Sequence, residues 1–487
     1  MIFTSFEFAL FLPVAFLVYW MIPASGKWRN VFLLLASYFF YGSWDWRFLG
    51  LIVFSTLIDY KVGVSMLDSS RSRQKKLLFL SVFSNLSILF YFKYSNFFIE
   101  SFVDSFSFLG MSFSINRLSI ILPVGISFYT FQTLSYTIDV YRKQIKPKKE
   151  LLEFAAFVTF FPQLVAGPIE RATNLLPQFS TKKVFRYYEN GVRGIKQILW
   201  GLFKKAVIAD NCAEIVNEIF TNYNDESGYV LMFGAILFSF QIYGDFSGYS
   251  DIAIGTARLF GFDLMQNFNF PYFSRDIADF WRRWHISLST WFRDYLYIPL
   301  GGSKGGMKSK IRNTFIIFLI SGFWHGANWT FVFWGGLNAL LFLPLLVFGK
   351  NRKNLGDKVT DRLIPSFREV SSMVFTFCLI TICWVFFRSE SLSQAFYILK
   401  TIFKDLFSKE AMVKLVNQLH WEYGYIIPCL LVIFLIIEWV GKSGTYALET
   451  IFMSSNKVVR RLFYSFIVLL ISFYMATIES PFIYFDF

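Results

Sequence analysis

The sequence predicts an all-α protein that crosses a membrane several times, because three features of its composition coincide. Of its 487 residues, 55% are apolar and only 16% are charged, and the mean hydropathy is +0.47. Soluble domains usually carry about 25% charged residues. The aromatic fraction of 21% comes mainly from 64 Phe, a side chain that hydrocarbon tolerates on every side. The net charge of +14 is spread over short basic clusters between apolar runs. That pattern indicates membrane orientation and argues against nucleic-acid binding.

Apolar runs of about 20 residues mark the candidate spans. They lie at roughly 3–22, 30–43, 46–65, 77–98, 118–140, 228–243, 311–323, 329–348, 370–387, 424–441 and 461–478. We therefore predict about 11 transmembrane helices in a single membrane domain over 1–487. The run at 1–22 lacks the basic start and small-residue cleavage site of a signal peptide, so we interpret it as an uncleaved first span.

The basic loops predict the orientation. Clusters of Lys and Arg occupy 71–76, 142–149, 304–312, 350–353 and 457–461, whereas the 96–117 loop carries Glu100 and Asp104 against Arg117. Cytoplasmic loops of multi-span proteins are enriched in Lys and Arg. This predicts that both termini lie outside the cytoplasm. The 388–423 loop, with four Lys balanced by four acidic residues, fits this orientation less well.

The middle of the chain predicts irregular membrane elements. The run 151–168 contains Pro162, Gly167 and Pro168, which suits a re-entrant or broken helix. The segment 182–205 mixes seven basic residues with apolar ones and is typical of an interfacial helix on the cytoplasmic surface. The four cysteines form no paired motif. We expect packed thiols there, with neither disulfides nor a metal site.

Histidines are the strongest candidates for chemistry. Only three occur, and His285 and His325 lie in the tryptophan-rich segments FWRRWHISLSTW (280–291) and SGFWHGANW (321–329). An ionisable group at membrane depth usually faces a cavity and marks a site. Imidazole also suits proton removal from an alcohol near neutral pH. The alternative is that each histidine packs and hydrogen-bonds against a neighbouring helix. His420 stands in a loop and is expected at the surface.

Charged residues near these histidines have two alternative roles. Asp245 and Asp251 lie in YGDFSGYSD at the end of a candidate span, where carboxylates either cap a helix or contact substrate. Arg282 and Arg283 either form ion pairs within their own segment or attract the phosphate of a nucleotide. The residues alone leave both alternatives open for each pair.

Several long motifs in a fixed order resemble the membrane-bound O-acyltransferase superfamily, in particular its alginate O-acetylation branch. The matching segments are LPVGISFYTFQ (122–132), FPQLVAGPIER (161–171), YGDFSGYSDIA (243–253), NFPYFSRDI (269–277), the two histidine segments and PFIYF (481–485). The resemblance implies a multi-pass protein of the bacterial cytoplasmic (inner) membrane, with a helical core around a transmembrane funnel or tunnel. It places the catalytic core at about 118–348. It also implies an acyl group taken from a cytoplasmic thioester, with acetyl-CoA as the donor substrate and no bound cofactor.

The family's principal catalytic histidine falls on His325 and its second motif residue on His285. His325 would then remove the proton of the attacking hydroxyl, and a nearby donor would stabilise the oxyanion. We name His285, Asn328, Trp324 and Trp329 as candidates for that donor. The resemblance further implies a periplasmic or surface partner of the SGNH-hydrolase type and a polysaccharide acceptor. Membrane lipids are also expected to contact the protein.

Three other functions remain open. Within the superfamily, D-alanyl transfer to teichoic acid would use a carrier-protein donor. A transporter or channel for envelope precursors would use His325 as a proton relay. A structural scaffold would need neither histidine for chemistry. Fold likeness alone does not identify the polysaccharide.

Overall fold

The computed structural model describes residues 1–24, 26–108, 110–111, 116–165, 167–356, 362–451, 456–475 and 482–483. Within these ranges every regular element is a helix, which confirms the all-α prediction. Contacts divide the chain into two compact units. Unit 1 comprises Met1–Ile195 and Ala253–Met265, and unit 2 comprises Lys196–Ile252 and Gln266–Phe487. Most of the PFIYF motif and the end of the expected span 461–478 lie outside the described residues.

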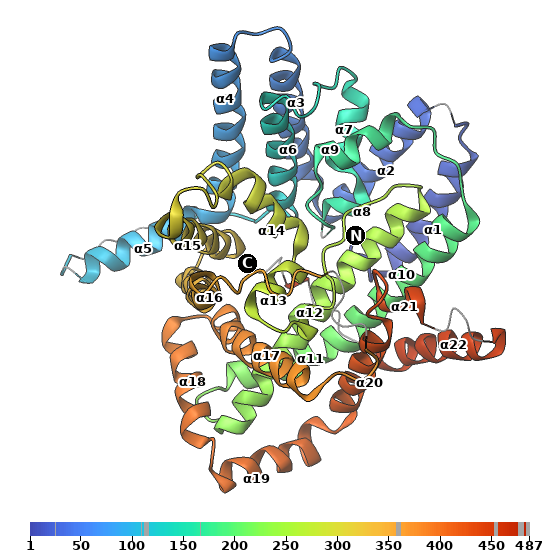
Figure 1. Cartoon of the computed structure of the whole chain (residues 1–487). Helices are drawn as coiled ribbons and strands as arrows, with labels where there is room; N and C mark the ends of the chain where they lie inside the picture. Colours follow the sequence, from blue (N-terminus) through green and yellow to red (C-terminus); the bar gives the residue numbers. More distant parts are fainter. Residues whose placement is uncertain are drawn as a thin grey trace. The chain divides into compact units, whose positions relative to one another are not determined.

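Unit 1 contains the N-terminal helices. They are α1 (Phe6–Met21), α2 (Gly26–Asp45), α3 (Leu49–Ser65), α4 (Arg71–Leu89), α5 (Ser95–Phe108), α6 (Ile126–Tyr141), α7 (Leu151–Thr159), α8 (Phe161–Leu164) and α9 (Ala172–Leu175). Helices α3, α4 and α6 pack side by side (Figure 1). The buried Asp59 of α3 joins this bundle, because it accepts hydrogen bonds from Ser81 and Asn85 of α4 at 2.5 and 2.9 Å. A carboxylate buried between helices needs such partners.

The predicted break in 151–168 is confirmed. Helix α7 ends at Thr159, and α8 starts at Phe161 with Pro162 in its first turn. Side chains of unit 1 satisfy backbone groups at the break: Ser37 Oγ accepts from Phe161 N at 3.0 Å, and Gln132 Nε2 donates to Phe157 O at 2.8 Å. Irregular backbone persists at membrane depth only where such partners exist.

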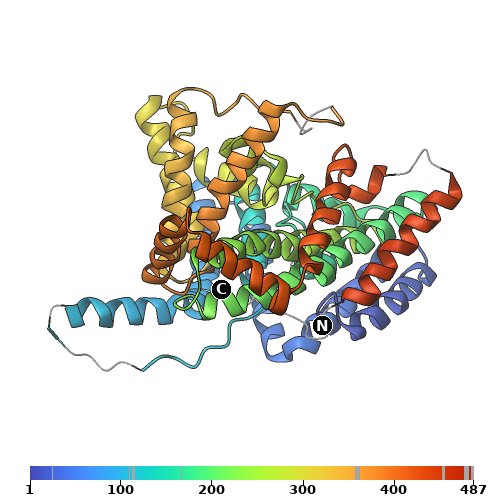
Figure 2. The ribbon, with the colours of Figure 1, turned by 90° about the horizontal axis from the view of Figure 1, so that it is seen from below.

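Unit 2 contains the remaining helices. They are most of α10 (Arg193–Leu202), α11 (Asp210–Thr221), most of α12 (Gly228–Leu259), α13 (Ile277–Arg283), α14 (Ile286–Phe292), α15 (Gly306–His325), α16 (Trp329–Val347), α17 (Phe367–Arg388), α18 (Leu392–Asp405), α19 (Lys409–Gln418), α20 (Ile426–Gly441), α21 (Ala447–Thr450) and α22 (Lys457–Tyr474). Figure 2 shows α15 and α16 lying side by side. They approach closely through glycine, since a Cβ at Gly322 would clash with the Phe331 carbonyl oxygen and one at Gly335 with that of Phe318. This contact fixes α15, which ends at His325.

Five helices among the described residues are long and apolar enough to cross a membrane. They are Lys27–Ser65, Arg71–Phe108, Gly228–Leu259, Trp329–Val347 and Phe367–Arg388. A pair bent by 94°, Lys409–Tyr423 and Ile426–Gly441, makes a sixth if it counts as one span, and the count of about 11 stays a prediction. The predicted end of a span at residue 243 is wrong, because α12 continues to Leu259. The expected runs 30–43 and 46–65 also join into one apolar stretch.

The cysteine prediction is correct in part. All four thiols are free, and Cys212 and Cys383 are buried. Cys378 and Cys429 are exposed, so the prediction of packed positions is wrong for these two. Both lie on apolar helices, α17 and α20, whose outer faces meet lipid in a membrane-spanning protein.

The predicted surface helix at 182–205 is wrong at its C-terminal end. Lys204 and Lys205 are 3% and 1% exposed and lie in a π-helical stretch, Phe203–Ala209, that follows α10. Lys205 Nζ lies 2.7 Å from both Asp210 and Asp245, and Lys204 Nζ lies 2.5 Å from Asp251. The basic residues had suggested a helix on the membrane surface, because the partners Asp245 and Asp251 on α12 are distant in sequence. In the fold the two lysines neutralise these acids.

Removing Lys205 tests this buried ion cluster. We expect Lys205→Ala to lower the free energy of unfolding by about 3–5 kcal/mol, because it leaves two carboxylates buried without their cation. Thermal unfolding in detergent measures the change. Lys182→Ala, at an exposed position, should unfold like the native protein. Equal stability of both variants would contradict the proposed role of the cluster.

Candidate active site

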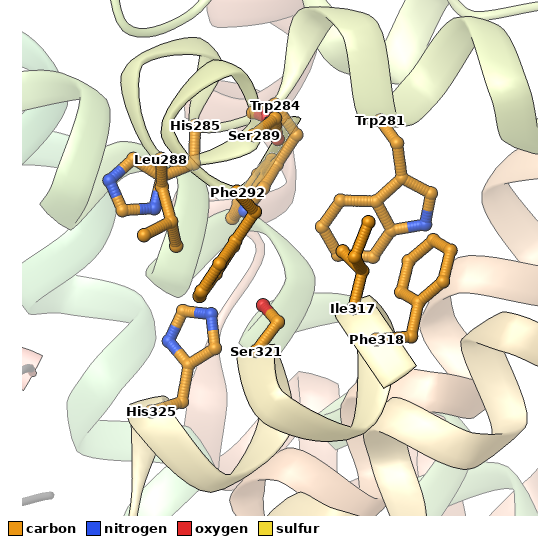
Figure 3. A pocket seen from close by; sticks show the side chains of 10 residues that line it. All are labelled: Trp281, Trp284, His285, Leu288, Ser289, Phe292, Ile317, Phe318, Ser321 and His325. Carbon is orange, nitrogen blue, oxygen red and sulfur yellow. The ribbon is translucent and has the colours of Figure 1, made fainter. Parts of the chain in front are cut away.

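A cavity of about 110 Å³ in unit 2 brings the two tryptophan-rich segments together. Its lining comes from the α13–α14 segment and from one face of α15 (Figure 3). The residues are Trp281, Trp284, His285, Leu288, Ser289, Phe292, Ile317, Phe318, Ser321 and His325. Both predicted catalytic histidines therefore face one cavity.

The backbone at His285 has an unusual conformation. His285 has φ +44° and stands between α13 and α14, in the left-handed region that side chains larger than glycine seldom adopt. The buried Asn267 fixes the turn: its carbonyl oxygen accepts from Ile286 N at 2.9 Å, and its Oδ1 accepts from Ser287 Oγ at 2.9 Å. Asn267 Nδ2 donates in turn to Ser250 Oγ of α12 at 3.1 Å. The strained turn directs the imidazole toward the cavity.

The His285 ring is enclosed by aromatic side chains. It is 1% exposed, and its centroid lies 4.6 Å from that of Phe246 and 6.0 Å from that of Trp324. Neither ring nitrogen has a hydrogen-bond partner among the described residues. Burial lowers the pKa of His285 to about 3, because the charged form loses its hydration. The imidazole is neutral at physiological pH and offers one donor and one acceptor.

His325 occupies the last position of α15. Its side chain is 3% exposed and packs among Trp324, Trp334 and Phe387, with ring centroids at 5.0, 5.2 and 5.4 Å. The rings of Trp334 and Phe387 stand steeply inclined to the imidazole, at 87° and 71°. This aromatic wall excludes water and holds the ring toward the cavity. A proton acceptor in such a dry site acts on substrate without competition from solvent.

The two imidazoles face each other across a short gap. Their centroids are 6.4 Å apart. This separation lets one small substrate group contact both rings, and general acid–base catalysis requires such direct contact. The residues that line the cavity include no carboxylate. No group of three or more His, Cys, Asp or Glu side chains that could hold a metal ion occurs among the described residues. The chemistry that these side chains offer is proton transfer and hydrogen bonding by imidazole.

The predicted charged residues lie elsewhere. Asp245 pairs with Lys205 at 2.7 Å and accepts from Ile483 N at 2.7 Å. Arg282 donates to the carbonyl oxygens of Asn351 and Asn354 at 2.9 and 3.0 Å. Arg283 pairs with Asp279 at 2.8 Å. None of the three lines the cavity. The sequence had left structural contacts and substrate contacts open for these residues. The structure supports the structural contacts, which are ion pairs and hydrogen bonds to backbone.

Two further predicted donors stand next to the cavity but not in its lining. Trp324 packs against both imidazoles. Asn328 begins α16 instead: its Oδ1 accepts from Thr330 N at 3.0 Å, and its Nδ2 donates to Glu390 O at 3.0 Å. These bonds hold the Asn328 amide at the start of α16, and the residue does not line the cavity.

The last two residues singled out by sequence are exposed. Trp329, the fourth candidate donor, is 55% exposed at the start of α16 and does not line the cavity. His420 is exposed as well, as predicted. The site therefore contains two of the three histidines.

Several lining residues escaped sequence reasoning. Ile317 and Ser321 precede His325 by eight and four positions, so they share its face of α15. Leu288, Ser289 and Phe292 follow His285 at helical spacing along α14. Counting in steps of three and four from each histidine would have found them. Which helix faces meet across the cavity is set by tertiary packing.

Comparison with known proteins identifies the family. The family model for the membrane-bound O-acyltransferase family matches residues 34–387, a range that contains both histidines. The chain belongs to the membrane-bound O-acyltransferase family. It is an acyl-transferring enzyme of the membrane, as the sequence resemblance predicted.

Relatives cover most of the chain. The probable alginate O-acetylase AlgI of Pseudomonas aeruginosa is 41% identical over 410 residues, which is 83% of this chain and 75% of the relative. The peptidoglycan O-acetyltransferase of Helicobacter pylori is 36% identical over 80% of this chain and 77% of the relative. The teichoic acid D-alanyltransferase of Bacillus subtilis is 29% identical over 54% of this chain and 67% of the relative.

Substitution at His285 tests the strained turn separately from catalysis. We expect His285→Val to be less stable than His285→Asn by about 1–3 kcal/mol, because Asn tolerates the left-handed region and a β-branched residue does not. Thermal unfolding in detergent compares the two. If Val and Asn give the same melting temperature, the backbone at this position is not under the constraint described.

Proposed function

We propose that this chain transfers an acetyl group from acetyl-CoA on the cytoplasmic side toward a hydroxyl of an envelope or extracellular polysaccharide. The observation that carries the proposal is the pair of buried imidazoles facing one cavity. A hydroxyl must lose its proton to attack a thioester, and a desolvated neutral imidazole is suited to take it. His325 is the proposed base, and His285 holds the attacking oxygen or the carbonyl from the opposite wall.

The bond changes balance without a further reactant. The hydroxyl oxygen forms a new bond to the acyl carbon, and its proton moves to His325. The tetrahedral intermediate then collapses, the carbon–sulfur bond breaks, and the thiolate takes the proton back from His325. The products are an ester and free coenzyme A. The aromatic walls contribute by excluding water, which would otherwise hydrolyse the thioester.

Two arguments favour acetyl over D-alanyl transfer. Relatives named as O-acetylating enzymes match at 36–41% identity over 80% or more of this chain. The named teichoic acid D-alanyltransferase matches at 29% over 54%. Alginate and peptidoglycan are substrates in the names of those relatives, and either class of polymer fits the proposal. D-alanyl transfer from a carrier protein is the second candidate.

The proposal includes a partner and a location. The protein lies in the bacterial cytoplasmic membrane with both termini outside the cytoplasm, as the basic loops favour. A periplasmic or surface protein of the SGNH-hydrolase type completes transfer to the polymer. The acyl group passes from the cavity either to the serine of that partner or to the sugar itself.

Acyl transfer in proteoliposomes tests the role of His325. With radiolabelled acetyl-CoA and the candidate partner present, His325→Ala should reduce label transfer by at least about 10²-fold, because it removes the base. His420→Ala, a change to an exposed histidine, should keep native turnover.

Size-exclusion profiles check that both variants fold. Undiminished transfer by a folded His325→Ala variant would rule out this residue as the base. If native protein transfers no label from acetyl-CoA but does transfer D-alanine from a carrier, the second candidate function replaces the first.

A further inference from the structure

Ser321 presents a hydroxyl to the cavity that makes no hydrogen bond with another described residue. It lies on α15 four residues before His325 and is 8% exposed. Figure 3 shows its Oγ directed into the space beneath the Phe292 ring, beside the His325 imidazole. Residues four apart on a helix have Cβ atoms about 5–6 Å from each other. Ser321 and His325 therefore reach neighbouring atoms of one small substrate.

Nearby hydroxyls on the two cavity helices are occupied. On α15, Thr314 donates to the Lys310 carbonyl oxygen at 2.8 Å, and on α14, Thr290 donates to that of Ile286 at 2.8 Å. Ser289, the other serine of the lining, points its Oγ at the Trp284 carbonyl oxygen at 3.4 Å. A serine within a helix commonly returns its hydroxyl to the carbonyl four residues back or turns it to solvent. The hydroxyl of Ser321 makes no such bond within the described part of the chain and faces the cavity instead.

The reaction requires a donor at this place. When a hydroxyl attacks a thioester, negative charge develops on the carbonyl oxygen, and a donor already oriented toward that oxygen stabilises it most in a water-excluded site. The attacking oxygen and the carbonyl oxygen are bonded to the same carbon in the intermediate. A proton acceptor and a hydrogen-bond donor one helical turn apart can therefore serve the two oxygens at once.

We propose that the Ser321 hydroxyl donates a hydrogen bond to the thioester carbonyl oxygen and stabilises the oxyanion while His325 takes the proton of the attacking hydroxyl. The inference rests on the proposed acyl transfer. Ser321 acts as a donor and keeps its own proton, so no acyl group becomes attached to it. Asn328 caps α16 and does not line the cavity.

Kinetics with acetyl-CoA in proteoliposomes test the role. Ser321→Ala should lower kcat by on the order of 10²-fold, with the KM for acetyl-CoA and the melting temperature close to native, because the lost bond forms in the transition state. Ser321→Thr keeps the hydroxyl and should recover most of the activity. Thr314→Ala is the matched control from the same helix, because this hydroxyl returns to the Lys310 carbonyl oxygen and Thr314 does not line the cavity; it should turn over at close to the native rate.

Three outcomes would overturn the inference. One is a folded Ser321→Ala variant with native kcat. Another is that Ser321→Ala and Ser321→Thr lose kcat to the same extent and melt at similarly lowered temperatures, which would indicate a packing role. The third is an acetyl group on Ser321 detected by mass spectrometry of protein quenched during turnover, since that would make the serine a nucleophile. If the native protein itself transfers no acetyl group, the proposed function fails, and this inference fails with it.

Discussion

The arrangement of the site depends on burying two imidazoles among aromatic side chains at the same cavity. Each ring is almost fully buried, and aromatic side chains surround both of them. Burial disfavours the imidazolium form, so a histidine in such a setting is available as a proton acceptor. Other features of unit 2 serve this constraint. Asn267 holds the left-handed turn at His285, and the glycine contact between α15 and α16 holds the helix that ends at His325.

The buried charges of the same unit follow a different logic. Lys204 and Lys205 neutralise Asp251 and Asp245 on α12 and so allow this helix to carry acidic residues through its buried middle. Taking ions out of water is expensive, and the arrangement persists only because each charge meets a partner of opposite sign. The acids of the YGDFSGYSD motif thereby stabilise α12. From this helix Phe246 packs against the His285 ring, and Ser250 accepts a hydrogen bond from Asn267. Their contribution to the site is structural.

Sequence reasoning predicted the membrane class, the family and the two histidines, because these depend on composition and on long local motifs. It failed where distant segments decide the outcome. In the sequence, Lys204 and Lys205 are typical of an interfacial helix, and only the fold shows that they pair with acids of α12. The 16-residue α6 is almost wholly buried by other parts of the protein. Its apolar residues are therefore explained by packing, and their number does not by itself indicate a membrane span. Ser321 carries no signal as a single residue, and only its position relative to the cavity distinguishes it from other helix serines.

The most direct test of the account is a structure of the protein bound to a non-reactive acetyl thioester analogue of coenzyme A. We expect the acetyl carbonyl to lie in the cavity between His285 and His325, with its oxygen within hydrogen-bonding distance of the Ser321 hydroxyl. We also expect the imidazole of His325 to face the side from which a hydroxyl attacks. An acetyl group bound elsewhere, with this cavity empty, would contradict the central claim.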